Sequence, residues 1–379
     1  MKFIHLSDLH LGKRVNGFSM IEDQRFILKQ ILELVAEEAP QAVLIAGDVY
    51  DKSVPSEEAV ELFDGFLNKL TELCQRVFIL AGNHDSAERL AFGGSLFGKS
   101  GVHVSPVYHG EIEPVVLEDE FGPVSVWMLP FIKPAHIRRY WSDADVKTTD
   151  DAVKYALSAC AVDQTVRNVL LAHQFVAGSV RCDSEELAVG GTDSVEVSAF
   201  DGFDYVALGH LHGPQKVGSE TVRYAGSPLK YSFSEVRQNK TVAVVELKEK
   251  GDVSVRLLPL TPMRDLVELR GTYDHLILRE VYEASGHQMD YVHITLTDET
   301  DIPHAAARLR VIYPYLMKLV YDNQRTRSAG VIQEPEALET LSPMELFAAF
   351  YQKQNNADLG EEQQQYLEGI LRRIWEGMV

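Results

Sequence analysis

Five short apolar runs, each followed by residues that can hold a metal or move a proton, constrain the fold of this chain most. They span residues 2–7, 42–46, 77–81, 168–172 and 203–208. Runs of this length suit strands that are buried on both faces, which are typical of α/β proteins. In such proteins, ligand-binding groups gather beyond the carboxyl ends of the strands. The runs therefore predict an α/β fold with one functional site at the strand ends.

Helical periodicity between the runs agrees with this fold class. Apolar residues recur at helical spacing from Ile21 to Glu38, and Pro40 follows as a stop signal. A second helix is predicted from Ser56 to Gln75, because Pro55 suits its first turn, and a third near residues 150–161. Further strands are predicted at residues 124–129, 222–225, 241–247 and 253–258.

The acidic composition limits how the chain can bind nucleic acid. A net charge of −20 over 379 residues disfavours a broad basic surface that wraps DNA or RNA. It is compatible with a nucleic-acid substrate, because bound divalent cations supply positive charge where phosphates need it. Another subunit is then expected to carry much of the affinity. The candidate contacts to DNA are Lys13, Arg14, Arg138 and Arg139.

The absence of membrane-length apolar runs and of paired cysteine motifs indicates where the protein is located and that its cysteines are not cross-linked. No long uncharged apolar run stands at the amino terminus and none elsewhere has membrane length, so we expect a cytoplasmic protein that binds no membrane. Cys74, Cys160 and Cys182 are odd in number and widely spaced. They therefore indicate neither a disulfide framework nor a structural zinc site.

Seven side chains that follow the apolar runs are candidate metal ligands. They are Asp8, His10, Asp48, Asn83, His173, His210 and His212. A single histidine at a strand end is more often a hydrogen-bonded structural residue, but the joint pattern favours ligands. Mixed carboxylate, amide and imidazole ligands suit manganese, iron or zinc. Because seven ligands exceed the needs of one ion, we predict two ions about 3.5–4 Å apart, bridged by the carboxylate of Asp48.

The order of these motifs resembles that of the calcineurin-like metallophosphoesterases. The motifs are Asp8-Leu9-His10, Gly47-Asp48, Gly82-Asn83-His84-Asp85, His173 and Gly209-His210-Leu211-His212. The resemblance covers residues 1 to about 260 and implies a two-sheet β-sandwich flanked by helices. It also implies two ligand sets that share Asp48. One set is Asp8, His10, Asp48 and His212, and the other is Asp48, Asn83, His173 and His210.

His84 is the candidate general acid. An imidazole beside an ion, yet not bound to it, can stay protonated and donate to the departing oxygen of a phosphodiester. Two cations also depress the pKa of bound water, which supplies the nucleophile. For Asp51 two roles are open: it accepts a hydrogen bond from His84 and orients the ring, or it caps the following loop.

Within the superfamily, the chain is similar to the SbcD family of DNA-repair nucleases. Residues 1–12, 82–86 and 224–229 carry this likeness, with Tyr231, Phe233 and Glu235 behind them. It implies an ATP-dependent double-strand exonuclease and single-strand endonuclease in DNA repair, recombination and replication. The implied cofactor is two manganese ions, with magnesium, iron and zinc as open alternatives. Alternative functions are a phosphoesterase for cyclic nucleotides or phosphoproteins, and a non-catalytic binding subunit.

A change of character near Met263 suggests further domains. We predict a nuclease domain over residues 1–262, a small α/β capping domain over 263–322, a linker over 323–340 and a helical tail over 341–379. The capping domain is predicted from strands at residues 267–269, 291–296 and 315–320 and a helix at 305–312.

The tail begins with the capping-box sequence Ser342-Pro343-Met344-Glu345 ahead of two helices with apolar stripes. These helices either pack on the core of the chain or, as the family likeness implies, dock on the SMC-like ATPase partner SbcC. The likeness also implies a homodimer within a heterotetramer, formed through helices at residues 56–75 and 87–97. Apolar positions in those helices are equally compatible with an intramolecular core.

Overall fold

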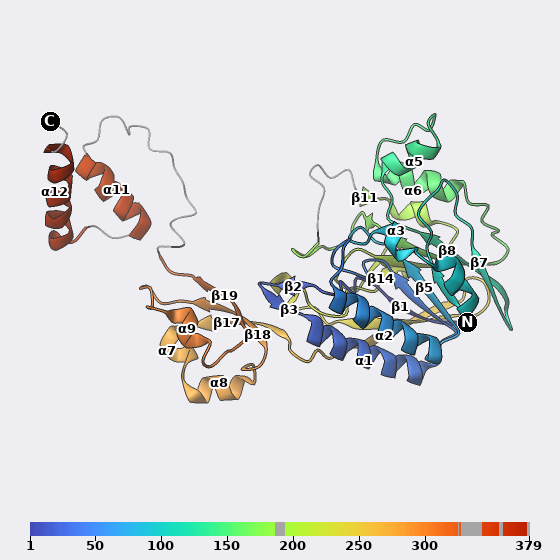
Figure 1. Cartoon of the computed structure of the whole chain (residues 1–379), viewed down its shortest axis with the longest axis horizontal. Coiled ribbons are helices and arrows are strands. Elements are labelled where there is room, and N and C mark those ends of the chain that lie inside the picture. The colour runs from blue at the N-terminus through green and yellow to red at the C-terminus, as the bar shows by residue number, and fades with distance from the viewer. Residues whose placement is uncertain (186–193, 325, 327–342, 356–358, 377–379) are drawn as a thin grey trace. The chain divides into compact units, whose positions relative to one another are not determined.

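The structure, a computed structural model, describes residues 1–185, 194–324, 326, 343–355 and 359–376 (Figure 1). The chain divides into two units, Met1–Leu266 and Val267–Val379. In the described residues, no helix is long and apolar enough to cross a membrane. The three cysteines are free thiols.

The first sheet of the first unit has six strands in the order β16-β15-β1-β4-β5-β6. The strands are β1 (Lys2–Leu6), β4 (Ala42–Ala46), β5 (Arg76–Leu80), β6 (Val102–Val104), β15 (Thr241–Leu247) and β16 (Val253–Pro259). The pairs from β1 through β4 and β5 to β6 are parallel, whereas β15 and β16 add antiparallel strands beyond β1. The carboxyl ends of β1, β4 and β5 therefore meet at one edge.

The second sheet has six strands in the order β13-β14-β12-β9-β8-β7. The strands are β7 (Val115–Asp119), β8 (Gly122–Leu129), β9 (Arg167–His173), β12 (Tyr205–Gly209), β13 (Gln215–Val217) and β14 (Ser219–Tyr224). Its four middle strands are parallel, and the register places Gly209 beside His173. The two strands that precede the predicted histidines are thus neighbours.

The main core lies between the two sheets. Phe3, Leu44 and Phe78 of the first sheet share a buried cluster with Val169 and Leu171 of the second. Side chains alternate along a strand, so the other buried residues of each sheet face outward and need a cover of helices. Those helices are α1 (Ile21–Glu38) and α2 (Glu57–Leu73), which lie side by side, and α5 (Pro134–Tyr140) and α6 (Thr149–Ser158), which pack on the second sheet. The predicted sandwich flanked by helices is confirmed.

The helix boundaries follow local signals at most sites. The helix predicted from Ile21 to Glu38 is found with the same bounds, and Ser56 caps α2 by accepting from Ala59 N. One expected helix is wrong, because residues 87–97 form two short helices, α3 (Ala87–Leu90) and α4 (Gly94–Phe97). Gly93 separates them with a φ of 75°.

The remaining elements of the first unit are short. They are β2 (Arg14–Val15), β3 (Phe18–Ser19), β10 (Phe175–Val176), β11 (Ser194–Val195), η1 (Gly98–Ser100), η2 (Val197–Phe200) and η3 (Phe233–Glu235). The β2–β3 hairpin follows the first motif, and η3 follows the residues that carry the SbcD likeness.

The second unit contains a three-stranded sheet and short helices. The sheet has the order β17-β18-β19, with β17 (Leu266–Gly271), β18 (Tyr291–Leu296) and β19 (Leu316–Tyr321). The helices are α7 (Tyr273–Leu276), α8 (Arg279–Ser285) and α9 (Ala305–Leu309), so the helix predicted over 305–312 is shorter than expected. Val292, Ile294, Leu309 and Tyr313 form its buried core.

Two helices are described in the tail, α11 (Pro343–Asn355) and α12 (Glu361–Glu376). Gln363 Nε2 donates to the hydroxyl of Tyr351 over 3.1 Å. The predicted capping residue Ser342 and nearly all of the predicted linker over 323–340 lie outside the described residues.

Candidate metal centre

The ends of five strands bring the seven predicted ligands to one place. The turn after β1 is tied to the turn after β4, since Asp8 N donates to Gly47 O over 3.0 Å and His10 N to Asp48 O over 2.9 Å. The second sheet joins them, because His210 N donates to the Asp8 carboxylate over 3.0 Å. Main-chain hydrogen bonds therefore tie the turns after β1 and β4, and the Asp8 carboxylate ties the second sheet to them.

The set Asp8, His10, Asp48 and His212, called the His212 group below, is closely packed. The Nε2 atoms of His10 and His212 are 3.1 Å apart, and His10 Nε2 lies 3.6 Å from Asp48 Oδ2. Asp8, His10 and His212 offer ligand atoms within 4.8 Å of one another. All four residues are buried.

The set Asp48, Asn83, His173 and His210, called the His173 group below, converges in the same way. Asn83 Oδ1 lies 3.0 Å from His173 Nε2 and 2.9 Å from His210 Nδ1. Asp48 Oδ2 lies 3.3 Å from His173 Nε2. This carboxylate oxygen is thus shared by both groups, which is the arrangement that a bridging ligand needs.

The backbone is strained where these side chains are presented. Asp8, His10, Asp48 and His210 have φ values of 52°, 45°, 51° and 106°, in a region that residues with a Cβ rarely adopt. Such strain persists only when the surrounding structure enforces it, and it clusters at functional sites. The hydrogen bonds between the strand-end turns provide that enforcement.

Two glycines allow the turns to approach one another. A Cβ at Gly209 would lie 1.8 Å from Ala46 O, and a Cβ at Gly82 would lie 2.1 Å from Asp48 Oδ1. Neither contact is sterically feasible. These glycines are therefore needed because the backbone passes directly against the ligand groups.

The donor set fits a divalent cation. His173 Nδ1 lies 2.9 Å from the Ala46 carbonyl, which can only accept, so this nitrogen carries a proton. In a neutral ring, Nε2 then directs a lone pair at the oxygens of Asn83 and Asp48. Acceptors that face one another in a buried site need a proton or a cation between them.

Without a metal ion, a proton on His173 can separate the acceptors that face one another in the site. Burial opposes the charged form of His173, but the adjacent Asp48 carboxylate outweighs it and raises the pKa to about 9. Burial lowers the pKa of His210 to about 3 and raises that of Asp8 to about 6. The site therefore holds its extra proton mainly on His173 at neutral pH.

Metal binding should release that proton. His173 is protonated below pH 9 in the metal-free chain, so an ion that binds Nε2 must displace hydrogen. The apparent affinity of the His173 group should rise about tenfold per pH unit up to about pH 9 and level off above it. Calorimetry in two buffers of different ionisation enthalpy should report about one proton released at neutral pH; zero would contradict the assignment.

Comparisons with known proteins decide the family. Residues 1–214 match the family described as calcineurin-like phosphoesterase, and residues 262–355 match the type 5 capsule protein repressor C-terminal domain. The chain is 31% identical to the SbcD subunit of nuclease SbcCD from Staphylococcus epidermidis and 32% identical to that of Staphylococcus saprophyticus, over 99% of each chain. The chain belongs to the SbcD family. Membership in this phosphoesterase family implies that it binds divalent metal.

A solved structure aligns more weakly. A dimetal phosphatase from Danio rerio shares 11% identity and a TM-score of 0.40, over 68% of this chain and 95% of its own. The assignment to the SbcD family does not rest on it.

In this member of the SbcD family, His84 stands beside both groups without joining their closest contacts. Its ring centroid is 4.7 Å from that of His10, and its main-chain N donates to Asp48 Oδ1 over 2.9 Å. The ring is held by Asp51 through the main chain, since His84 Nδ1 lies 2.9 Å from Asp51 O. The Asp51 carboxylate is instead paired with Lys13 over 2.7 Å. The hydrogen bond that orients the His84 ring is therefore present, and it is accepted by the main-chain carbonyl of Asp51 and not by its carboxylate.

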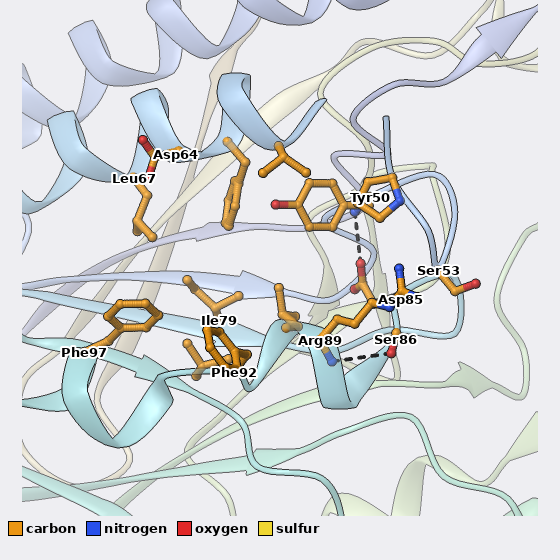
Figure 2. A pocket seen from close by; sticks show the side chains of 15 residues that line it. Tyr50, Ser53, Asp64, Leu67, Ile79, Asp85, Ser86, Arg89, Phe92 and Phe97 are labelled. Carbon is orange, nitrogen blue, oxygen red and sulfur yellow. Dashed lines mark hydrogen bonds between the residues drawn. The ribbon is translucent and has the colours of Figure 1, made fainter. Parts of the chain in front are cut away.

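Asp85 is a structural residue of the site for which the sequence patterns indicated no role. Its carboxylate accepts from Val49 N, Tyr50 N and Gly82 N over 3.0–3.1 Å. Figure 2 shows the bond from Tyr50. Burial raises its pKa to about 6, so it is ionised at neutral pH. One carboxylate therefore fixes both the turn after Asp48 and the turn before Asn83. Its place beside His84 was the only sequence signal.

Gln24 and Tyr231 support the backbone of His10. Gln24 Nε2 donates to His10 O over 2.7 Å and to the Tyr231 hydroxyl over 3.0 Å, and that hydroxyl donates to Leu9 O over 2.6 Å. Gln24 lies on α1, where helical periodicity gives it no special function. Gln24 reaches the Asp8-Leu9-His10 motif only in the folded chain, so its sequence position alone did not indicate this contact.

The four basic residues predicted to contact DNA have intramolecular partners. Lys13 pairs with Asp51, Arg14 donates to Gly17 O, and Arg138 donates to Val146 O. The guanidinium of Arg139 lies 5.7 Å from the centre of the Tyr140 ring. Their role toward DNA stays a prediction.

Proposed function

We propose that this chain hydrolyses phosphodiester bonds of DNA with two divalent ions. The observation that carries the proposal is the Asp48 carboxylate oxygen, which lies 3.6 Å from His10 Nε2 and 3.3 Å from His173 Nε2. One ligand shared by two groups of nitrogens and oxygens is the feature of a two-metal site. The relatives are named as parts of a nuclease, which supports a nucleic acid as the substrate.

The His212 group would hold one ion and the His173 group the other. Imidazole ligands combined with carboxylate and amide oxygens suit manganese, iron or zinc better than magnesium, which prefers oxygen ligands alone, and manganese is the ion that we propose. When bound, two such ions supply Lewis acidity toward the phosphate and lower the pKa of water. The protein contributes fixed ligand positions, because the strained turns and their hydrogen bonds hold them before the ions arrive.

His84 would donate a proton to the departing oxygen. The Asp51 carbonyl only accepts, so His84 Nδ1 carries one proton, and the proton that the imidazolium would donate to the departing oxygen is the second one, on Nε2. His84 is half-buried, whereas the predicted ligands other than Asn83 and His210 are buried, so its ring is open to a substrate. Lys13, which pairs with the Asp51 carboxylate, fixes the loop that carries this carbonyl.

A substrate panel tests the proposal. The purified chain with manganese should cleave single-stranded DNA, as expected of an endonuclease in repair and recombination. Cleavage of linear duplex DNA should appear when the ATPase partner and ATP are added. Cyclic nucleotides and phosphopeptides should be poor substrates. Efficient turnover of either small substrate without cleavage of DNA would favour the alternative phosphoesterase function. Binding of manganese without any hydrolysis would favour a non-catalytic subunit.

We further propose that the chain works with an SbcC-type ATPase, which would make its double-strand exonuclease activity depend on ATP. Removing residues 341–379 should abolish complex formation, because α11 and α12 would supply the docking surface. Hydrolysis of a small diester such as bis-p-nitrophenyl phosphate should be unchanged, since the metal centre lies in the first unit. Size-exclusion chromatography with the ATPase gives the measurement; undiminished complex formation would contradict the docking role.

A homodimer through the α2, α3 and α4 face is the matching proposal for self-association. Phe92 and Leu96 are 83% and 67% exposed there, and a pocket of about 440 Å³ lies between these helices (Figure 2). Exposed apolar residues beside a hollow suit a protein interface. Phe92→Asp with Leu96→Asp should convert the dimer to a monomer in light scattering and leave hydrolysis of the small diester intact. A dimer that persists would place the interface elsewhere.

A further inference from the structure

A chain of hydrogen bonds leads from the ring of His212 to a buried ion pair. His212 Nδ1 lies 2.8 Å from Ser184 Oγ, and Ser184 donates to Glu235 Oε1 over 2.6 Å. The second oxygen of Glu235 accepts from Lys240 Nζ over 2.5 Å. Glu235 is 0% exposed and Lys240 is 5% exposed, so the pair lies away from water directly behind a predicted ligand.

These partners fix which nitrogen of His212 carries the proton. Glu235 is a carboxylate that accepts on both oxygens, because Lys240 Nζ donates to its Oε2 over 2.5 Å and Tyr231 N donates to its Oε1 over 3.2 Å. A carboxylate only accepts, and the single hydroxyl hydrogen of Ser184 therefore points at Glu235. Ser184 can then bond to His212 only by accepting from Nδ1–H. His212 Nε2 is left with its lone pair, and it faces His10 Nε2 at 3.1 Å.

Lys240 ties this network to the main chain of His212. Its Nζ donates to His212 O over 2.8 Å, to Ser227 Oγ over 3.0 Å and to Gln238 Oε1 over 2.9 Å. A buried ammonium group needs such partners, because desolvation is otherwise too costly. One ion pair therefore holds both the backbone and the ring of this residue.

We propose that Glu235, acting through Ser184, is a positioning residue that holds His212 in the tautomer able to bind a divalent ion. A carboxylate behind a metal-binding imidazole fixes the ring and raises its basicity, and losing it typically costs about 10–100-fold in metal affinity. The inference rests on the proposed function, because it takes His212 as a ligand. Neither Glu235 nor Ser184 is among the seven predicted ligands.

Ser184→Ala is the least disruptive test. It removes the hydroxyl that links His212 to Glu235 and leaves the Glu235–Lys240 ion pair intact. In calorimetric titration with manganese and no substrate, we expect the Kd of one ion to rise about 10–100-fold and that of the other to stay unchanged. Ser184→Thr keeps the hydroxyl and should restore the affinity. The control is Ser158→Ala, which removes a hydroxyl that donates to Tyr155 O on α6 and should change neither Kd.

Glu235→Gln is a second variant that tests the proposal in the same titration. The amide retains an acceptor for Ser184 but loses the charge, so the same Kd should rise. The double variant should bind no more weakly than the weaker single variant, because both changes interrupt one relay. Circular dichroism of the metal-free variants reports folding independently.

The outcomes separate the inference from the function on which it rests. A folded Ser184→Ala protein with unchanged affinity for both ions would overturn the relay through Ser184, even if its Tm were lower. Because Glu235 Oε1 also lies 3.5 Å from His212 Nδ1, unchanged affinity in Glu235→Gln as well would overturn the role of Glu235. A wild-type chain that fails to bind two manganese ions would instead overturn the proposed function.

Discussion

Asp48→Asn should remove binding of both ions and, with it, hydrolysis. The charge of this one carboxylate serves both the His212 group and the His173 group, and a neutral amide cannot balance two cations. We expect kcat/KM for DNA to fall by at least about a thousandfold, because a catalytic metal supplies several kcal/mol and each 1.4 kcal/mol is tenfold. The substitution keeps the acceptor for His84 N, so the turn itself should persist.

Calorimetry with manganese and DNA cleavage give separate readouts for this variant. The matched control is Asp163→Asn, because that exposed carboxylate bonds to Thr165 in a loop before β9. The control should bind two ions and cleave DNA at the wild-type rate. Retention of both ions by folded Asp48→Asn protein would show that Asp48 does not bridge the two groups.

His84→Ala should retain both ions and lose hydrolysis of DNA. Its Nδ1 bonds to Asp51 O and its ring packs edge-on against that of His10, but it is not one of the seven predicted ligands, so metal affinity should be unchanged. Losing a general acid typically costs about 100–10,000-fold in rate. The loss should depend on the leaving group: a DNA alkoxide needs a proton as it departs, whereas p-nitrophenolate does not.

The comparison of two substrates therefore isolates the role of His84. Hydrolysis of bis-p-nitrophenyl phosphate should fall much less than cleavage of DNA. The exposed His109, whose ring bonds to Val107 O, gives the control variant His109→Ala, which should behave like wild type on both. Equal losses on both substrates would point to a binding role for His84, and loss of an ion would make it a ligand.

Local patterns in the sequence were sufficient for the strands and helices that matter most. The apolar run at residues 42–46 became β4 with those bounds, and α1 began and ended where periodicity and Pro40 placed it. Both predictions depend on neighbouring residues alone. The helix expected over residues 87–97 failed because Gly93 adopts a left-handed conformation that hydrophobic spacing does not reveal.

Contacts between distant segments could not be read in the same way. Asp51 was expected to accept a hydrogen bond from His84 or to cap a loop, but which atom would accept was open. The main-chain oxygen lies 2.9 Å from His84 Nδ1, because Lys13, 38 residues away, pairs with the carboxylate. Gln24 bonds to His10 O, and its partner Tyr231 lies 207 positions further along the chain. Such pairings depend on how two sheets pack, and no periodicity records them.

The sequence by itself determined the residue types at the strand ends and their order, and these were sufficient to predict the family and a site for divalent metal. Only the tertiary structure supplied the distances from Asp48 Oδ2 to His10 Nε2 and His173 Nε2, and only it placed Glu235 behind His212. The physical reason is the range of the forces involved. Strand and helix formation follows from neighbouring residues, whereas a metal site needs side chains from β1, β4, β5, β9 and β12 to converge within a few ångströms.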